Sequence, residues 1–421
     1  MKPILICFLI LSSCAYAQTG SEHWVASWTT PQPMIRNPPP APRPPAAPGA
    51  PATPGRGPNP VQQAINSRGF KDQTVRMIVH TSIGGSKVRL KFSSPFGGTA
   101  VTLGEVHVAL RSKDSEIVSS SDHAVKFNGK PGCTIGPGMV ILSDPVDLAV
   151  PKLADVAVSV YLADETGPPS AHNGLHTTYI SKAGNITGAA AIADPLTTQA
   201  YYWLEGLDVL APRTDGLIVA LGDSITEGFR STPDTNRTWP DILSERLAAN
   251  KATARFAVAN MGIGGNRVLR DGTGASAVAR FDRDVLSQSG VEWVVMLESI
   301  NDIGHGNTEP VSADDLIGGF KQIVERAHTH GLKVMGCTLP PFDGANYATA
   351  EGEAIREALN NWIRTGGAFD GVADFEAATR DASNPKRLRA EFDPGDHLHL
   401  NDAGYKAMGD AIDLSVFSKK R

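Results

Sequence analysis

The hydrophobic pattern of this chain changes its period near residue 213, and this change constrains the fold more than any other feature. Between residues 73 and 180, apolar and polar residues alternate in short runs that are separated by glycine-rich turns. The clearest runs cover residues 74–81, 87–92, 101–110 and 156–162. Alternation with period two and regular turns is typical of an antiparallel β-sandwich or barrel.

From residue 215 onward the pattern becomes an alternation of strands and helices. Continuous apolar runs predict strands at residues 217–221, 256–259, 293–297, 333–338 and 372–375. Segments of helical length predict helices at residues 239–250, 313–330, 351–365 and 403–414. This indicates an α/β fold, a parallel sheet with helices on both faces, in which ligands bind beyond the carboxyl ends of the strands. The length of 421 residues suggests two domains, and we expect a β-rich domain at 18–212 and an α/β domain at 213–421.

The first 17 residues have the pattern of an export signal. Lys2 precedes an apolar run at 4–11, and small residues at 15–17 form a cleavage motif before Gln18. We therefore expect a secreted or periplasmic protein. One alternative remains open, because residues 11–14 also resemble a lipoprotein box that would leave the chain anchored through a lipid on Cys14. We favour ordinary cleavage after Ala17.

Residues 31–60 consist largely of proline, alanine and glycine, with almost nothing to bury. This composition favours extended polyproline conformation or irregular structure. Because a strand-like segment at 23–28 precedes it, we interpret it as a long loop inside the β-rich domain.

Charge and cysteine content narrow the possible partners. A net charge of −5 without a basic stripe argues against nucleic acid. Outside the first residues no apolar run is long enough to span a bilayer. Cys7 and Cys14 lie in the signal, and Cys133 and Cys337 are expected to be small buried residues, since a disulfide framework needs more cysteines at shorter spacing.

A serine follows the first strand of the α/β half almost directly. Ser224 lies in the sequence Gly-Asp-Ser-Ile-Thr-Glu-Gly, where a strand-to-helix turn would place its hydroxyl and backbone N–H at the edge of the sheet. Taken alone this signal is weak, because a serine in a turn is usually only a turn residue. The motif is not a nucleophile elbow, since Thr226 occupies the place of its second glycine.

The next two strands end in groups that can donate hydrogen bonds. Residues 260–267 contain a glycine cluster, but Arg267 stands where the third glycine of a dinucleotide loop would be. A tight turn that exposes a backbone N–H fits better. Asn301 follows the third strand; asparagine is a common turn former there, and its amide can also donate to developing negative charge.

The last motif supplies a candidate base. A serine nucleophile needs a base, and the base needs an orienting acceptor. Asp396 precedes His399 by three residues, whereas Asp393 could reach His397 only at a longer spacing and across a proline. We therefore predict that His399 acts on Ser224 and that His397 has a structural role. The alternative, a metal bound by the two histidines, lacks a third ligand cluster with suitable spacing.

These four motifs, in order at successive strand ends, resemble the SGNH/GDSL hydrolase family. Ser224 matches its GDSxTxG block, Gly265 the second block, Asn301 the GxND block, and Asp396 and His399 the DxxH block. The resemblance implies a flavodoxin-like three-layer α/β/α sandwich. It also implies an oxyanion hole formed by the N–H groups of Ser224 and Gly265 and the Asn301 side chain. The implied chemistry is two-step acyl transfer without a metal or organic cofactor.

The resemblance covers roughly residues 217–414 and has two departures. Ser299 replaces the usual glycine of the third block, and Leu400 replaces the proline that often follows the histidine. The β-rich half is similar to that of a bacterial two-domain subgroup that includes acylhydrolases associated with xylan degradation. Together with the export signal, the resemblance implies a secreted esterase that removes short acyl groups, above all acetyl, from carbohydrate or small-molecule esters.

Two alternatives to this substrate and activity remain. A lipase or lysophospholipase ranks lower, because the loop at 230–238 is polar and no long apolar lid is visible. The other alternative is a carbohydrate-binding protein with an inert hydrolase domain. The complete set of site residues argues against this alternative.

Overall fold

The computed structural model describes residues 21–34, 59–306 and 308–418. The export signal, Cys14 and most of the proline-rich segment lie outside the described residues. Within the described ranges, no helix has both the length and the apolar character needed to cross a bilayer.

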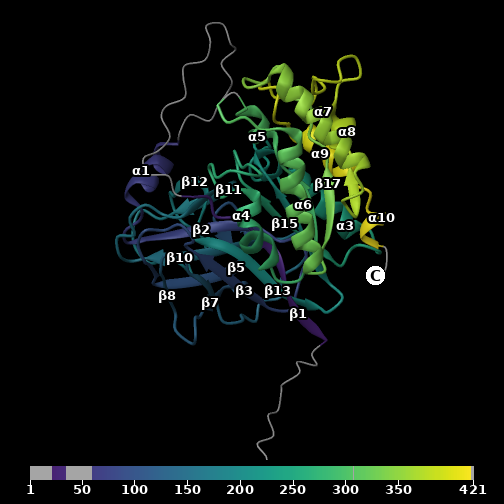
Figure 1. Ribbon diagram of the computed structural model, residues 1–421. Coiled ribbons are helices and arrows are strands. Elements are labelled where there is room, and N and C mark those ends of the chain that lie inside the picture. Colours follow the sequence, from purple (N-terminus) through teal and green to yellow (C-terminus); the bar gives the residue numbers. More distant parts are fainter. Residues whose placement is uncertain (1–20, 35–58, 307, 419–421) are drawn as a thin grey trace, which may run out of the picture.

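The β-rich half is built from antiparallel sheets (Figure 1). One sheet has the strand order β1-β13-β3-β9, the other has the order β12-β11-β2-β10-β5-β6, with β7 also paired to β5, and β4 pairs with β8. The strands are β1 (Glu22–Thr29), β2 (Gln73–His80), β3 (Val88–Ser93), β4 (Val101–Leu103), β5 (Glu105–Lys113), β6 (Glu116–Ile117), β7 (His123–Val125), β8 (Cys133–Ile135), β9 (Val140–Leu142), β10 (Asp155–Leu162), β11 (Ala171–Ile180), β12 (Leu196–Tyr202) and β13 (Leu204–Pro212). Helix α1 (Pro60–Arg68) lies beside β12.

The single strand predicted at 101–110 is wrong, because the chain changes sheets at Gly104. Strand β4 pairs with β8, whereas β5 pairs with β10. The backbone N–H of Gly104 donates to the Tyr161 carbonyl at 2.9 Å. Alternation with period two cannot reveal such a change of partner, because the pattern of inward and outward side chains continues through it.

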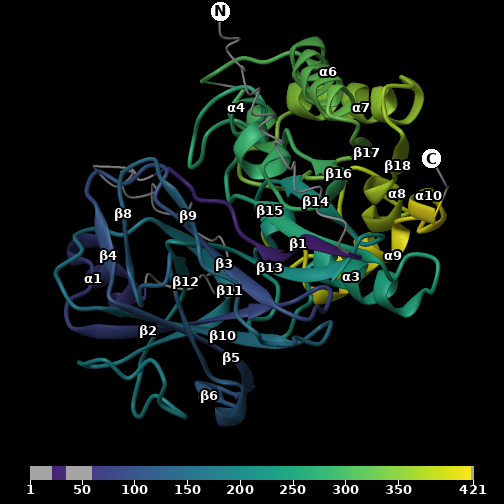
Figure 2. The ribbon, with the colours of Figure 1, turned by 90° about the horizontal axis from the view of Figure 1, so that it is seen from below.

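The α/β half contains a parallel sheet of order β15-β14-β16-β17-β18. Its strands are β14 (Gly216–Gly222), β15 (Phe256–Gly262), β16 (Val291–Leu297), β17 (Lys333–Cys337) and β18 (Gly371–Ala373). Its helices are α2 (Ser224–Glu227), α3 (Trp239–Ala249), α4 (Ala277–Phe281), α5 (Ile300–Gly304), α6 (Ala313–Thr329), α7 (Ala350–Thr365), α8 (Phe375–Thr379), α9 (Asp402–Ala411) and α10 (Ser415–Ser418). Figure 2 shows α4, α6 and α7 on one face of the sheet and α3, α8 and α9 on the other. This strand order and these layers are those of the flavodoxin-like fold, so the predicted fold class is confirmed.

Local sequence explains where the longer helices begin. Thr238 and Asp241 form a capping box at the start of α3, and Ser312 and Asp315 form another at the start of α6. Each box satisfies backbone N–H groups that have no partner inside the helix. Strand β14 is buried along its whole length, as its continuous apolar run predicts.

The two halves share one hydrophobic core, which includes Val25 of β1 and Val258 of β15. The N–H of Ala26 donates to the Ser289 carbonyl at 3.0 Å, and that of Val258 donates to the Ser82 hydroxyl at 3.0 Å. The pairing changes from antiparallel to parallel between β13 and β14, where we expect the domain boundary. The boundary stays a prediction.

The described cysteines do not pair with each other. Cys133 in β8 is partly buried, and Cys337 in β17 is buried. Burial raises the pKa of the Cys133 thiol to about 11 and that of Cys337 well above its usual value. Both therefore stay protonated near neutral pH, which makes them poor nucleophiles.

Candidate active site

Ser224 lies at the carboxyl end of β14, at the first position of helix α2. Asp223 caps this helix, because its side chain accepts the Ile225 N–H at 2.8 Å. Gly222 is needed at the turn, since a Cβ there would lie 2.0 Å from the Thr226 hydroxyl and 2.6 Å from the Leu297 carbonyl. The chain thus turns sharply into the helix and leaves Ser224 9% exposed at the edge of the sheet.

The structure brings Ser224, His399 and Asp396 together. The Ser224 hydroxyl lies 2.9 Å from His399 Nε2, and His399 Nδ1 lies 3.1 Å from Asp396 Oδ2. The other carboxylate oxygen, Oδ1, accepts the backbone N–H groups of His399 at 2.9 Å and Leu398 at 3.2 Å. Burial would raise the pKa of Asp396, but the hydrogen bonds from His399 and the backbone outweigh it and hold this pKa well below its usual value. Asp396 is therefore an ionised acceptor that orients the imidazole.

His397 lies in different surroundings. Its side chain is 48% exposed, against 13% for that of His399, and its Nδ1 lies 2.5 Å from the Asp393 carboxylate. The sequence made this pair look remote, but the left-handed backbone of His397 (φ 59°) lets the chain fold back to Asp393. The two histidines thus pair with two different aspartates, and Ser224 contacts His399.

The second and third motifs meet beside the serine turn. The Asn301 Nδ2 donates to the Asn266 carbonyl at 3.0 Å, which leaves a second amide N–H for another acceptor. Gly265 has a φ of 76°, a left-handed conformation that favours glycine. The turn that carries Gly265 is tied to β14, because the Ile263 N–H donates to the Gly222 carbonyl at 3.0 Å.

Comparison with known proteins assigns this part of the chain. Residues 220–407 match the model of the GDSL-like Lipase/Acylhydrolase family. This part of the chain belongs to that family. The resemblance inferred from the motifs is confirmed, and all of the predicted site residues lie inside the matched range.

Comparison with curated proteins found no match. Among solved structures, a GDSL-like lipase from Bacteroides thetaiotaomicron is 20% identical, with a TM-score of 0.38, over 49% of this chain and 89% of that chain. The acetylxylan esterase Axe2 from Geobacillus stearothermophilus is 20% identical, with a TM-score of 0.36, over 47% of this chain and 91% of that chain.

A buried arginine holds the motif turns of the GDSL-like domain, and sequence reasoning missed it. Arg280 of α4 donates to the Asn266 side chain at 2.8 Å, the Met261 carbonyl at 2.7 Å and the Gly222 carbonyl at 2.9 Å. It also forms an ion pair with Asp284 at 3.0 Å. The two carbonyl partners lie at the ends of β15 and β14, so a single guanidinium fixes the turns that carry Ser224 and Gly265.

Several carboxyl groups near the serine are buried. Burial raises the pKa of Asp223 to about 7, and nearby Asp302 adds to the rise while the Ile225 N–H and Arg280 oppose it. Burial likewise raises the pKa of Glu227 to about 8 against the hydrogen bond from Gly264. These groups carry little negative charge below neutral pH, whereas Asp396 is ionised beside His399.

An exposed aromatic ring flanks the histidine, and it too was missed. Phe229 is 45% exposed, and its ring meets the His399 ring edge-to-face with centroids 4.6 Å apart. The Arg230 guanidinium lies 5.0 Å from the Phe229 centroid, and Arg230 Nε donates to Asp396 Oδ2 at 3.1 Å. Phe229 stands one residue before the loop that the sequence identified as polar.

Within the part of the chain that the structure describes, no group of three or more histidine, cysteine or acidic residues could hold a metal ion. The metal alternative for His397 and His399 thus finds no third ligand among those residues.

Proposed function

We propose that this protein is a serine esterase that hydrolyses carboxylic esters, with Ser224 as nucleophile, His399 as general base and Asp396 as its orienting acceptor. The observation that carries the proposal is the continuous hydrogen-bonded line from the Ser224 hydroxyl through His399 to Asp396. This line lies in a domain of the GDSL-like lipase/acylhydrolase family.

The mechanism follows from these contacts. Ser224 Oγ attacks the ester carbonyl while His399 Nε2 takes its proton. The N–H groups of Ser224 and Gly265 and the second amide N–H of Asn301 stabilise the oxyanion. As the tetrahedral intermediate collapses, His399 gives its proton to the leaving alcohol, and an acyl-enzyme remains. Water then attacks the acyl group with His399 again as base, which releases the acid and restores Ser224.

The proposed substrates are short acyl esters, above all acetyl groups on carbohydrate. Two observations support this choice over a lipid ester. The loop after the serine is polar from Arg230 to Thr238 and offers no apolar lid. The exposed Phe229 ring beside the base gives the departing alcohol an apolar face of limited size. The export-signal pattern of residues 1–17 supports action outside the cytoplasm, with a lipid anchor at Cys14 as the alternative.

Matched histidine variants test the proposal. Ser224→Ala and His399→Ala should each lower hydrolysis of p-nitrophenyl acetate by about 10³-fold or more, because the two residues act as one unit. His397→Ala is the control and should be far milder. A fluorophosphonate should label wild-type protein but not Ser224→Ala. Wild-type protein that neither hydrolyses nor is labelled would favour the carbohydrate-binding alternative with an inert hydrolase domain.

Two further measurements separate the remaining alternatives. Activity should be unchanged in EDTA, and a loss that zinc restores would revive the metal interpretation of His397 and His399. Rates should fall as the acyl chain lengthens from acetate to octanoate, and acetylated xylan should be deacetylated faster than lysophospholipid is cleaved. The reverse preference would identify a lipase.

A further inference from the structure

One segment of the β-rich half reaches across to the loop that follows the serine turn. The pairing of β11 with β12 is interrupted between Asn173 and Thr178, so the intervening residues leave the ladder. There the Asp234 carboxylate accepts the backbone N–H of Thr177 at 2.7 Å and its hydroxyl at 2.6 Å. The Asp234 N–H donates in turn to the Leu175 carbonyl at 2.8 Å. The interrupted segment of β11 thus grips Asp234, in the sense that it forms hydrogen bonds with both the side chain and the backbone of this residue.

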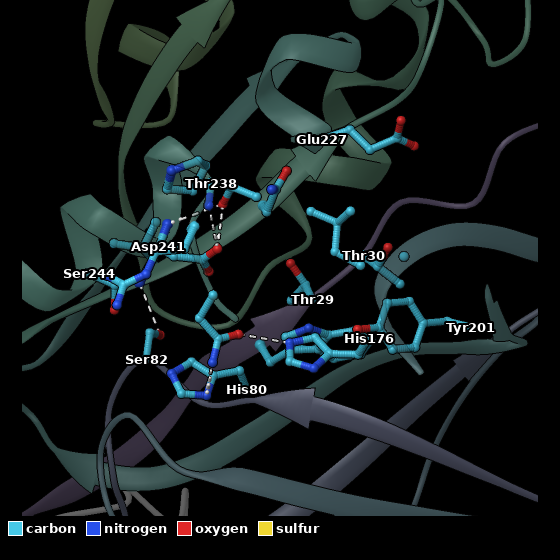
Figure 3. Close-up of a pocket in the computed structure, with 18 of the residues that line it drawn as sticks. Thr29, Thr30, His80, Ser82, His176, Tyr201, Glu227, Thr238, Asp241 and Ser244 are labelled. Atoms are coloured by element: carbon cyan, nitrogen blue, oxygen red, sulfur yellow. Dashed lines mark hydrogen bonds between the residues drawn. The ribbon is translucent and has the colours of Figure 1, made fainter. Parts of the chain in front are cut away.

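A second contact lies beside the first. His176 Nε2 lies 2.8 Å from the Asn236 side-chain oxygen, and Asn236 Nδ2 lies 3.1 Å from His80 Nδ1. The two histidine rings are nearly parallel, with an interplanar angle of 13°. Figure 3 shows His80 and His176 side by side, joined by dashed lines through one side chain of the loop. Asn236 therefore bridges two strands of the β-rich half.

The backbone of the gripped loop is strained. Arg230, Asp234 and Asn236 have φ values of 79°, 61° and 55°. Non-glycine residues adopt this left-handed conformation less often than the other conformations, and it persists where the surroundings favour it. The β-rich half forms its hydrogen bonds with Asp234 and Asn236, which are two of the residues with left-handed backbone.

Close packing alone does not fix the loop where the β-rich half meets the α/β half. A cavity of about 90 Å³ separates the two halves here, lined among others by Thr29, His172 and Ser244 (Figure 3). Each of these three side chains has a buried polar atom without a hydrogen-bond partner among the described residues. The path of the loop is therefore set by hydrogen bonds, from the β-rich half to Asp234 and Asn236 and from Asp402 of α9, which accepts the Ser231 hydroxyl at 2.9 Å and the Thr232 N–H at 2.8 Å.

The other end of the same loop contacts the acid–base pair. Arg230 donates to Asp396 at 3.1 Å, and the Phe229 ring lies against His399. The Phe229 carbonyl accepts the Tyr405 hydroxyl at 2.6 Å. Asp234 lies only four positions after Arg230 in the chain, so a shift at the gripped end reaches the residues beside Asp396 and His399.

We propose that the β-rich half positions the acid–base pair of the esterase. Its β11 segment holds Asp234, and thereby keeps Arg230 on Asp396 and Phe229 against His399. The inference rests on the proposed function. Thr177 and Asp234 are positioning residues that act through Phe229 and Arg230. It follows that the α/β half carries the reacting groups but depends on the β-rich half for their alignment.

Variants of the grip in the full chain test this inference. Asp234→Gly removes the carboxylate, and glycine accepts the left-handed backbone without strain. Thr177→Val removes one hydrogen bond at nearly constant shape. Asp234→Asn is the conservative variant, because an amide can accept the Thr177 N–H, donate to its hydroxyl and tolerate the same φ. Thr102→Val is the matched control, since Thr102 also pairs through its hydroxyl, with Thr134 at 3.0 Å, on an exposed part of the β-rich half.

The measurement is kcat for p-nitrophenyl acetate per serine that reacts with a fluorophosphonate, together with the pH profile of kcat/KM. We expect kcat to fall about 10-fold in Asp234→Gly and about 3-fold in Thr177→Val, because misplacement of catalytic groups by less than 1 Å has effects of this order. Asp234→Asn should restore most of the rate, and Thr102→Val should match wild type. The pH profile should shift in Asp234→Gly, because Arg230 then leaves Asp396.

A role that is only structural would lower the number of reactive serines and leave their kcat and pH profile unchanged. That result in Asp234→Gly would overturn the inference but would leave the proposed esterase function unaffected. Wild-type protein without hydrolysis or labelling would contradict the proposed function before any variant is compared.

Discussion

Each half of the molecule buries an arginine completely, and the two have different surroundings. Arg76 of β2 donates to the Ser159 hydroxyl at 2.8 Å and to the carbonyls of Ser115, Thr187 and Ala189 at 2.6, 3.0 and 2.8 Å. Burial among these neutral oxygens lowers the pKa of its guanidinium. Arg76 thus fastens the loops that cover one face of the β-rich half.

Arg280 in the α/β half is surrounded by charge as well as by carbonyls. It lies 3.0 Å from the Asp284 carboxylate and 3.4 Å from that of Glu298, at the ends of the strands that carry the motifs. Burial raises the pKa of Glu298 well above its usual value, and Arg280 opposes the rise. The comparison teaches that Arg76 completes the scaffold of the β-rich half, whereas Arg280 at the sheet edge also sets the geometry and charge of the candidate site.

The largest effect is expected from removing these arginines. Arg280→Met should lower the free energy of unfolding by about 3–5 kcal/mol, because it leaves the buried oxygens of Gly222, Met261 and Asn266 without their donor and removes one of the two arginines beside Asp284. It should also lower kcat per reactive serine by about 10-fold or more, since the turns that carry Ser224 and Gly265 lose a common anchor. Arg76→Met should lower stability by about 3 kcal/mol through its unsatisfied carbonyls but leave kcat per reactive serine unchanged. Urea unfolding and fluorophosphonate titration measure the two quantities.

Arg280→Lys is a second variant for the case that Arg280→Met does not fold. It keeps the positive charge, and with it the folded state, but lacks the planar guanidinium. It should still reduce kcat, because an ammonium cannot reach all of the same acceptors. A fall of kcat per reactive serine in Arg76→Met would break the comparison, since a contact of the β-rich half outside the segment that holds Asp234 would then also affect the chemistry.

The next effect tests Asn301, the proposed oxyanion donor at the same edge. Asn301→Ala should lower kcat by roughly 10²–10³, as loss of one such donor does elsewhere, with little change in KM. The interaction tightens only in the transition state, which is why kcat carries the loss. Asn66→Ala on the exposed surface of α1 is the control and should leave both constants unchanged. An effect mainly on KM would make Asn301 a substrate-binding residue instead.

Stability against pH should expose the buried carboxyl of Glu227. In the folded protein this carboxyl has a pKa of about 8 and keeps its proton up to that pH, whereas in an unfolded chain it loses the proton near its ordinary pKa of 4.5. Between these values the folded state binds more protons, so the free energy of unfolding falls as pH rises and levels off above about 8. Between pH 7 and 8.5 the loss due to Glu227 should be about 1 kcal/mol, since one unit of pH corresponds to about 1.4 kcal/mol.

Glu227→Gln cannot lose this proton, so its stability should depend less on pH in that interval. Asp223, with a pKa raised to about 7, contributes in both proteins and cancels in the difference. Urea unfolding of both proteins at pH 7.0 and 8.5 measures this. Identical slopes would mean that Glu227 is ionised in the folded protein.

The sequence indicated where the candidate site lies, because parallel strands bring their carboxyl ends to one edge. Ser224 and Asn301 are far apart along the chain, yet each follows an apolar run closely enough to be placed at that edge. His399 lies well after the last strand, β18, with helix α8 between them, so the position of the strands alone does not place it. The pairing of His399 with Asp396 is local, so its spacing was sufficient to predict it. The alternation of the first half likewise indicated antiparallel sheets.

Contacts between residues far apart in sequence could not be predicted. Arg280 reaches Gly222 across 58 positions, and Thr177 reaches Asp234 across 57. The residues around them give no sign that either pair is in contact, because an arginine or a threonine in such a segment is usually exposed. The change of sheet at Gly104 could not be predicted for a related reason, because alternating apolar and polar residues do not indicate which strand a segment pairs with.

The smallest effect concerns Ser299, the departure from the family pattern. Ser299 is fully buried with a φ of 102°, a left-handed conformation that glycine adopts freely and serine does not. Its hydroxyl has no hydrogen-bond partner among the described residues, which adds to the cost. Ser299→Gly should therefore raise the free energy of unfolding by about 1 kcal/mol, the balance of relieved strain against the greater freedom of glycine in the unfolded chain. Because Asn301 keeps its own contact with Asn266, kcat should change by less than about 2-fold. Lower stability in Ser299→Gly would show that the hydroxyl has a partner, such as an ordered water, and that the serine helps to hold the turn before Asn301.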